Sequence, residues 1–175
     1  TGLGTINPLG NTVNSSWNAL INSQSGIKKI EKFNVEDYPC KIAASVADSL
    51  IDEQIVSSRD LRKIDRFIAL GLVAADEAIK DSGFVADEES SLSSGVMVGS
   101  GIGGLDTIYK NSSILDNQGI RKISPFFIPS ALINLLSGHI SIRYNLKGPN
   151  SSPVTACATG THAIGDSFTL IKNGK

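Results

Sequence analysis

The chain of 175 residues is 41% hydrophobic and 19% charged, which suits one globular domain with a sizeable core. Its 16 basic and 17 acidic side chains leave a net charge of −1 at pH 7, which argues against a nucleic-acid-binding protein. No apolar run is long enough to span a bilayer and no signal peptide is recognisable, so we expect a cytoplasmic protein that does not bind membranes.

The first third of the chain predicts four short elements. They are the end of a strand with a glycine-rich turn at 1–10, a helix at 11–21, a strand at 42–46 and a helix at 49–55. The helix at 11–21 is predicted from the helical spacing of its apolar residues, which are Val13, Trp17, Leu20 and Ile21.

The clearest helix is predicted over residues 58–82. A capping-box pattern, Ser57 to Asp60, begins it, and Gly83 supplies its C-terminal stop. Its wide apolar face consists of Leu61, Ile64, Phe67, Ile68, Leu72, Ala75 and Ile79. Gly71 in mid-helix costs about 1 kcal/mol relative to alanine, which indicates close packing at this residue.

The remainder alternates between loops, helices and apolar strands. We expect a solvated loop at 85–94, a strand at 96–98, a polar helix or loop at 109–119, a loop at 120–130, a helix at 131–144, a strand at 150–156 and a helix from Ala158 onward. Phe126 and Phe127 cannot both be buried by a local helix, so at least one should face a partner or a pocket. Alternating strands and helices indicate an α/β layered fold with a mixed, largely buried sheet.

Gly99 to Gly104 fit the pattern G-x-G-x-x-G between a strand and a helix, the context of a dinucleotide-binding turn. No strand ending in Asp or Glu follows at the right distance, so we reject nucleotide binding and expect no cofactor. Close approach of the backbone near an active site, or tight turning alone, explains these glycines better.

Cys157 lies at the predicted junction of a strand and a helix. Unpaired backbone N–H groups and the positive end of the helix dipole favour a thiolate there, so its sulfur is a candidate nucleophile. The alternative is a buried, inert thiol. His162 follows by more than one helical turn and cannot reach back to the sulfur, so we interpret it as structural and His139 as a core histidine. Cys40 is distant and no C-x-x-C spacing exists, so we expect neither a disulfide framework nor a metal site.

Four sequence blocks occur in order along the chain. They are Thr1-Gly2-Leu3-Gly4 with Asn7-Pro8-Leu9-Gly10, Gly99-Ser100-Gly101-Ile102-Gly103-Gly104, Arg121-Lys122-Ile123-Ser124-Pro125-Phe126-Phe127-Ile128-Pro129-Ser130, and Thr155-Ala156-Cys157-Ala158-Thr159-Gly160. Together they resemble the N-terminal half of the type II (elongating) β-ketoacyl-acyl carrier protein synthases. The resemblance implies a thiolase-like layered fold with a mixed β-sheet between helices, of which this chain would supply most of the first of two related halves. It also implies that residues 1–175 are an N-terminal β-ketoacyl synthase domain truncated at both ends.

The same resemblance implies a decarboxylative condensation. Cys157 would attack an acyl thioester carried on acyl carrier protein, and its own N–H would be one oxyanion donor. Malonyl-acyl carrier protein would then lose carbon dioxide, and the resulting carbanion would attack the acyl-enzyme. The family's two histidines and lysine for decarboxylation belong to the second half and match neither His139 nor His162. We therefore expect this chain to be acylated or alkylated at Cys157 at most, and not to complete the reaction.

Further residues are assigned roles by the resemblance alone. Ile102 matches a position lining the acyl pocket, and Phe127 matches an aromatic that reaches the pocket of the partner subunit in a homodimer. Basic positions that meet the acidic carrier protein are matched by Arg59, Arg62, Lys63, Arg121 and Lys122. Ordinary packing for the first two, and solvated helix faces for the basic residues, are the alternatives.

Two other classes of protein remain open. One is a non-catalytic subunit that only dimerises or binds carrier protein. The other is a thiolase, which shares the fold and the cysteine nucleophile and acts on coenzyme A thioesters. The block from Arg121 to Pro125 favours the synthase. Preference for carrier-bound over coenzyme A-bound acyl groups would discriminate the two enzymes.

Overall fold

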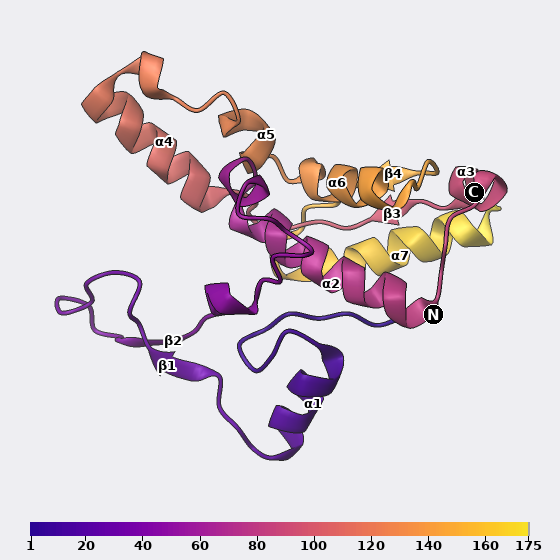
Figure 1. Ribbon diagram of the computed structural model, residues 1–175, viewed down its shortest axis with the longest axis horizontal. Helices are drawn as coiled ribbons and strands as arrows, with labels where there is room; N and C mark the ends of the chain where they lie inside the picture. Colours follow the sequence, from indigo (N-terminus) through magenta and orange to yellow (C-terminus); the bar gives the residue numbers. More distant parts are fainter. Residues whose placement is uncertain (175) are drawn as a thin grey trace. The chain divides into compact units, whose positions relative to one another are not determined.

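A computed structural model describes residues 1–174 (Figure 1). The chain divides into two compact units, residues 1–55 with 73–83 and residues 56–72 with 84–175. The α-helices are α1 (Val13–Ile21), α2 (Arg66–Ser82), α3 (Glu88–Ser93), α4 (Leu105–Gln118), α5 (Phe127–Ala131), α6 (Asn134–Tyr144) and α7 (Thr159–Lys172). The strands are β1 (Ile27–Lys29), β2 (Ile42–Ala44), β3 (Val96–Met97) and β4 (Asn150–Ser151), and the 3₁₀ turns are η1 (Asp48–Leu50), η2 (Asp60–Arg62), η3 (Ile120–Lys122) and η4 (Ala156–Ala158).

In the first unit, the N-terminal segment is held by acidic side chains of α2. The Glu77 carboxylate accepts hydrogen bonds from the backbone N–H groups of Thr5 (2.9 Å) and Val13 (2.8 Å), and Asp81 accepts from that of Leu3 (2.8 Å). Thr12 caps α1, as its oxygen accepts from the backbone N–H of Ser15. This network orders a segment in which no strand is assigned, so the predicted strand end at 1–10 is wrong.

The predicted helix at 11–21 is confirmed as α1, but its three largest apolar side chains are not covered by the described part of the chain. Trp17, Leu20 and Ile21 are each more than half exposed. The strand expected at 42–46 is the shorter β2, which pairs antiparallel with β1, an element that the sequence analysis missed. Only the η1 turn falls near the helix expected at 49–55.

The long predicted helix begins later than expected. The Ser57 hydroxyl accepts from the Asp60 backbone N–H at 3.2 Å, but Asp60 begins only the short η2 turn. Helix α2 starts at Arg66, because the Asp65 carboxylate accepts from the backbone N–H of Phe67 (3.2 Å) and from both the backbone N–H (3.1 Å) and the hydroxyl (2.6 Å) of Thr107. The prediction of one helix over 58–82 is therefore wrong before residue 66.

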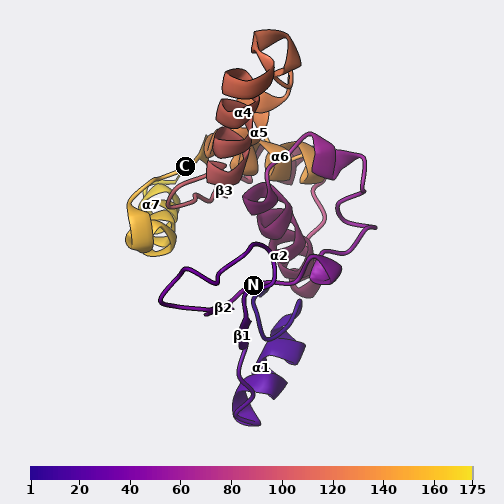
Figure 2. The same ribbon diagram turned by 90° about the vertical axis from the view of Figure 1, so that its left-hand side faces the viewer.

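The second unit carries the layered part of the fold. Strands β3 and β4 pair in parallel, and Figures 1 and 2 show β3 running between α6 and α7. The apolar core of this second unit includes Val56, Ile68, Leu72, Val96, Leu136, Ile140, Leu146 and Ala163. The close packing predicted at Gly71 is confirmed, since a Cβ added there would lie 2.5 Å from a methyl carbon of Leu136.

Several boundaries in this unit differ from the predictions. The loop expected at 85–94 contains α3, because Asp87 and Ser90 form a capping box that the sequence analysis overlooked. The loop expected at 120–130 contains η3 and α5, and the following helix begins at Asn134 and not at residue 131. The strand expected at 150–156 ends at Ser151, and both residues of β4 are exposed, so the sheet is less buried than predicted.

Candidate active site

Cys157 lies in η4, the single 3₁₀ turn that leads directly into α7. Its side chain is exposed, which excludes the interpretation as a buried, inert thiol. Within residues 1–174 no hydrogen bond joins its sulfur to another side chain. The sulfur is therefore open to an incoming reactant at the N-terminal end of a 14-residue helix.

The turn that carries the cysteine has an unusual backbone. Ala156 has a φ of 49°, in the left-handed region that costs an L-residue about 1–2 kcal/mol. Thr159, which is buried, holds this conformation from the helix side. Its hydroxyl oxygen accepts from the Thr155 N–H at 2.9 Å and donates to the Ala156 carbonyl at 2.8 Å. Cys157 thus lies on a strained turn whose backbone is hydrogen-bonded to Thr159, the first residue of α7.

A second set of contacts holds the same turn from its exposed side. The hydroxyl of Thr155 lies 3.2 Å from Nδ1 of His162, and Nε2 of His162 lies 3.2 Å from the Asp166 carboxylate. The inference that His162 does not pair with the sulfur agrees with these contacts. Sequence reasoning missed Thr155, Thr159 and Asp166, although an acidic residue four positions after a histidine in a helix is a recognisable pairing signal.

The glycine-rich segment from Gly99 to Gly104 packs against this turn. A Cβ added at Gly99 would lie 2.0 Å from the carbonyl oxygen of Pro153, and one at Gly101 would lie 3.2 Å from that of Ala156. At the other end of the segment, Gly104 would meet the Cα of Ala131 at 2.6 Å. These close approaches confirm that the glycines serve backbone contact beside the candidate site.

Ile102 projects from this glycine-rich segment and is 68% exposed. Phe127 is half-buried at the first residue of α5, while its neighbour Phe126 is 42% exposed, in keeping with the expectation that at least one faces outward. The structure therefore brings Ile102 close to the turn that carries Cys157, because its neighbour Gly101 packs against Ala156. The roles of Ile102 in an acyl pocket and of Phe127 at a dimer interface stay predictions.

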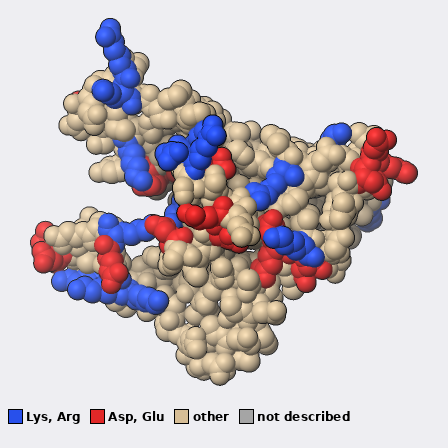
Figure 3. All heavy atoms as spheres, in the orientation of Figure 1, with Lys and Arg blue, Asp and Glu red and all other residues tan. Residues whose placement is uncertain are grey.

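The five basic residues singled out in the sequence lie on two turns. Arg59, Arg62 and Lys63 surround η2, and Lys63 Nζ lies 5.6 Å from the centre of the Phe126 ring. Arg121 and Lys122 are exposed in η3, which directly follows the C-terminal end of α4. Figure 3 shows Lys and Arg side chains at this end of the helix. All but Lys63, which is half-buried, are open to solvent, as contact with an acidic partner requires.

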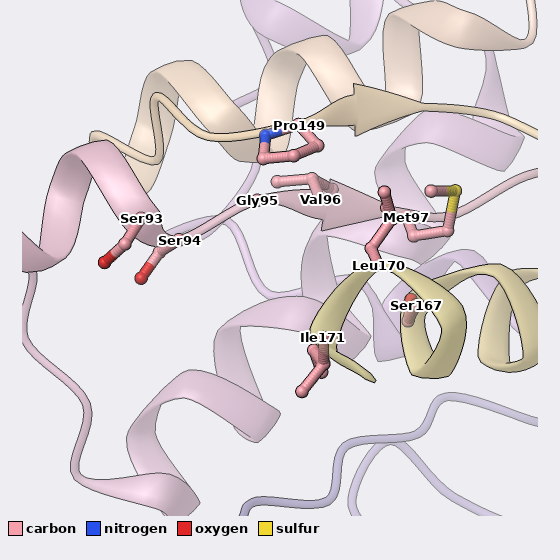
Figure 4. Close-up of a pocket in the computed structure, with 9 residues that line it drawn as sticks. All are labelled: Ser93, Ser94, Gly95, Val96, Met97, Pro149, Ser167, Leu170 and Ile171. Carbon is pink, nitrogen blue, oxygen red and sulfur yellow. The ribbon is translucent and has the colours of Figure 1, made fainter. Parts of the chain in front are cut away.

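A hollow of about 290 Å³ lies away from the cysteine (Figure 4). It is lined by Ser93, Ser94, Gly95, Val96, Met97, Pro149, Ser167, Leu170 and Ile171. Figure 4 shows the last turns of α7 forming one wall below β3. Because a helix rises about 1.5 Å per residue, Ile171 is roughly 20 Å from Cys157 along the axis, so this hollow belongs to a different part of the surface.

His139 lies half-buried in α6. Burial lowers its pKa below the ordinary histidine value, while the negative charge of Asp60 acts in the opposite direction. The interpretation of His139 as a core histidine is therefore too strong, because the residue is only half-buried. Among residues 1–174, no group of three or more His, Cys, Asp or Glu side chains is arranged to hold a metal ion, and no helix is long and apolar enough to cross a membrane.

Solved structures show which fold this chain has. The chain superposes on a β-ketoacyl synthase from Burkholderia phymatum with a TM-score of 0.82 and 22% identity, covering 100% of this chain and 43% of that one. It superposes on the ishigamide ketosynthase/chain length factor with a TM-score of 0.81 and 23% identity, covering 99% and 48%. The fold is therefore the thiolase-like fold of ketosynthases, as the resemblance implied.

The family model described as "Beta-ketoacyl synthase, N-terminal domain" matches residues 1–175, and the chain belongs to this family. The curated relatives include the 3-oxoacyl-[acyl-carrier-protein] synthase 2 of Vibrio harveyi, 45% identical over 99% of this chain and 42% of that protein. The enzyme of the same name from Coxiella burnetii is 47% identical over 98% of this chain and 41% of that protein. The chain thus spans about 42% of the length of these relatives.

Proposed function

We propose that this chain is the nucleophile-bearing part of a 3-oxoacyl-acyl carrier protein synthase of fatty acid synthesis, an acyltransferase. The observation that carries this proposal is the exposed Cys157 on a strained turn at the start of α7, beside the glycine-rich segment. The names of the relatives at 45% and 47% identity support the choice of reaction within the family.

The first step is acyl transfer to the sulfur. The Cys157 thiolate attacks the thioester carbonyl of an acyl-acyl carrier protein, and the tetrahedral oxyanion is stabilised by backbone N–H groups, that of Cys157 among them. The carbon–sulfur bond to the carrier breaks, and the carrier thiolate leaves and takes up a proton. The acyl group then remains on Cys157 as a new thioester.

The second step forms the carbon–carbon bond. Malonyl-acyl carrier protein loses carbon dioxide, the remaining carbanion attacks the acyl thioester, and the Cys157 thiolate is released with formation of 3-oxoacyl-acyl carrier protein. Of the two histidines in the chain, His162 is engaged with Thr155 and Asp166, and His139 lies half-buried in α6. We propose that the groups assisting decarboxylation belong to the length of the relatives that this chain does not match, so that the chain alone is acylated without completing the cycle.

Acyl carrier protein is the proposed partner. A ketosynthase of 26% identity, with a TM-score of 0.72 over 99% of this chain and 46% of that one, was solved in complex with an acyl carrier protein of a type II polyketide synthase. Four of the five basic residues matched to the carrier surface are exposed, and η2 and η3 present them. We further propose a cytoplasmic homodimer, with Phe127 at its interface and Ile102 in the acyl pocket.

Acyl transfer is tested by intact-mass measurement after mixing the protein with acyl-acyl carrier protein. The expected result is one adduct of the mass of the acyl group, absent from Cys157→Ala and retained in Cys40→Ala. Cys40 is a matched control because it is the second exposed cysteine. An adduct that persists in Cys157→Ala would refute the assignment of the nucleophile.

The same measurement separates the alternative functions. An adduct formed faster from acyl-coenzyme A than from the acyl carrier protein would favour a thiolase. No adduct from a protein whose circular dichroism shows it to be folded would favour a non-catalytic subunit that binds carrier protein or a second chain.

A further inference from the structure

We propose that Thr155, His162 and Asp166 form a positioning relay that fixes the turn carrying Cys157. The relay acts on the backbone of that turn and not on the sulfur. This inference deepens the proposed function and rests on Cys157 being the nucleophile of that function. None of the three residues touches the reacting atoms, so they are positioning residues.

The hydrogen bonds of the relay define a direction. The Asp166 carboxylate can only accept, so the proton between it and His162 is carried by Nε2 at a separation of 3.2 Å. In the neutral ring Nδ1 is then an acceptor, and the hydroxyl of Thr155, 3.2 Å away, donates to it. One carboxylate in the second turn of α7 thereby orients the ring, and the ring orients the threonine two residues before Cys157.

The placement of this relay explains why the turn needs it. Thr159 holds the backbone of Thr155 and Ala156 from the buried side through two hydrogen bonds. Its contacts leave the side chain of Thr155 free to rotate on the exposed side. The bond to His162 restrains that rotation, so the turn with Ala156 in the left-handed region is held from both sides.

The relay lies at the surface, and this distinguishes positioning from support of the fold. Thr155 and His162 are exposed, and the Asp166 side chain is 48% exposed. Hydrogen bonds and ion pairs at such positions contribute little to global stability because water replaces them. Loss of the relay should therefore change the reactivity of Cys157 and leave the denaturation midpoint nearly unaltered.

The experiment measures the second-order rate of alkylation of Cys157 by iodoacetamide, with alkylation of Cys40 in the same molecule as internal reference. Thr155→Val keeps the shape and removes the hydroxyl, whereas Thr155→Ser keeps the hydroxyl. Thr161→Val is the matched control, an identical substitution at an exposed position of α7. Urea titration of each variant follows the denaturation midpoint.

We expect Thr155→Val and His162→Gln each to slow alkylation of Cys157 by roughly three- to tenfold, the scale of one lost hydrogen bond. Thr155→Ser and Thr161→Val should react within about twofold of the unmodified protein. Combining Thr155→Val with His162→Gln should cost no more than either alone, because both remove the same bond.

Other outcomes overturn the relay. Equal rates in Thr155→Val and the unmodified protein would exclude a positioning role, as would additive losses in the double variant. A fall in rate accompanied by an equal fall for Cys40, or by a lowered denaturation midpoint, would assign the residues to the fold. Iodoacetamide needs no carrier protein, so the relay is judged separately from the proposed function, which is tested by the acyl adduct at Cys157 and by the preference for carrier-bound acyl groups.

Discussion

Substitution of Thr159 should change both the free energy of unfolding and the reactivity of Cys157. Thr159→Val is nearly isosteric, so packing of this buried residue is retained while two hydrogen bonds, to Thr155 N–H and Ala156 carbonyl, are lost. Each bond contributes about 0.5–1.5 kcal/mol, which sums to about 1–3 kcal/mol. Because Thr155 and Ala156 are exposed and water can reach their backbone groups, the lower part of this range applies, about 1–2 kcal/mol.

The assay combines urea titration, followed by circular dichroism, with iodoacetamide alkylation at Cys157. Thr159→Val should lower the free energy of unfolding by the stated amount and should also slow alkylation, since Ala156 can then leave the left-handed region. Thr159→Ser keeps the hydroxyl and loses a methyl group, so it should lower stability by about 0.8 kcal/mol and leave the alkylation rate unchanged. A Thr159→Val protein with unchanged stability and unchanged Cys157 reactivity would refute the reasoning.

Two further predictions concern packing and pH. Gly71→Ala should lower the free energy of unfolding by about 1–2 kcal/mol, because the added Cβ would meet the buried Leu136. Gly138→Ala should raise the free energy of unfolding by about 0.5–1 kcal/mol, because its Cβ would lie in open space. Equal effects of the two substitutions in urea titration would contradict this packing argument. Burial lowers the pKa of His139, so the unfolded chain binds a proton first and stability should fall as the pH drops below about 6.5. His139→Gln should flatten this fall and Asp60→Asn should deepen it, as measured by urea titration at pH 7 and 5.5, and an unchanged pH dependence in His139→Gln would exclude His139 as its source.

The fold class followed from the sequence because its strongest local signals coincide with real elements. Gly71 packs closely in α2, as its position in mid-helix indicated, and the glycine-rich segment makes the expected close backbone contacts. The helix start at residue 58 was wrong because the capping pattern at Ser57 is satisfied by a single 3₁₀ turn. What fixes the true start is a long-range contact of Asp65 with Thr107, which no local pattern reveals.

The candidate site was predictable at its centre and not at its periphery. Cys157 was proposed from the predicted junction of a strand and a helix, and the structure places it, exposed, just before α7, while its role stays a prediction. The left-handed conformation of Ala156 was missed because it is unfavourable for alanine, so no local pattern predicts it. Thr159 was overlooked because its hydroxyl bonds to the backbone three and four residues earlier, a local contact that the spacing of apolar residues does not reveal.

The glycine-rich segment has a consequence for how a protein of this kind could vary its substrate. Neighbouring atoms closely approach the four glycines of this segment, which are Gly99, Gly101, Gly103 and Gly104. A side chain at any of them would displace either the turn that carries Cys157 or the neighbouring backbone at Ala131. Ile102 is the one residue among them with a large exposed side chain. If Ile102 lines an acyl pocket beside Cys157, as we propose, changes of size at this position would reshape that pocket without displacing the turn, so Ile102 is where we would first test changes of acyl-chain preference.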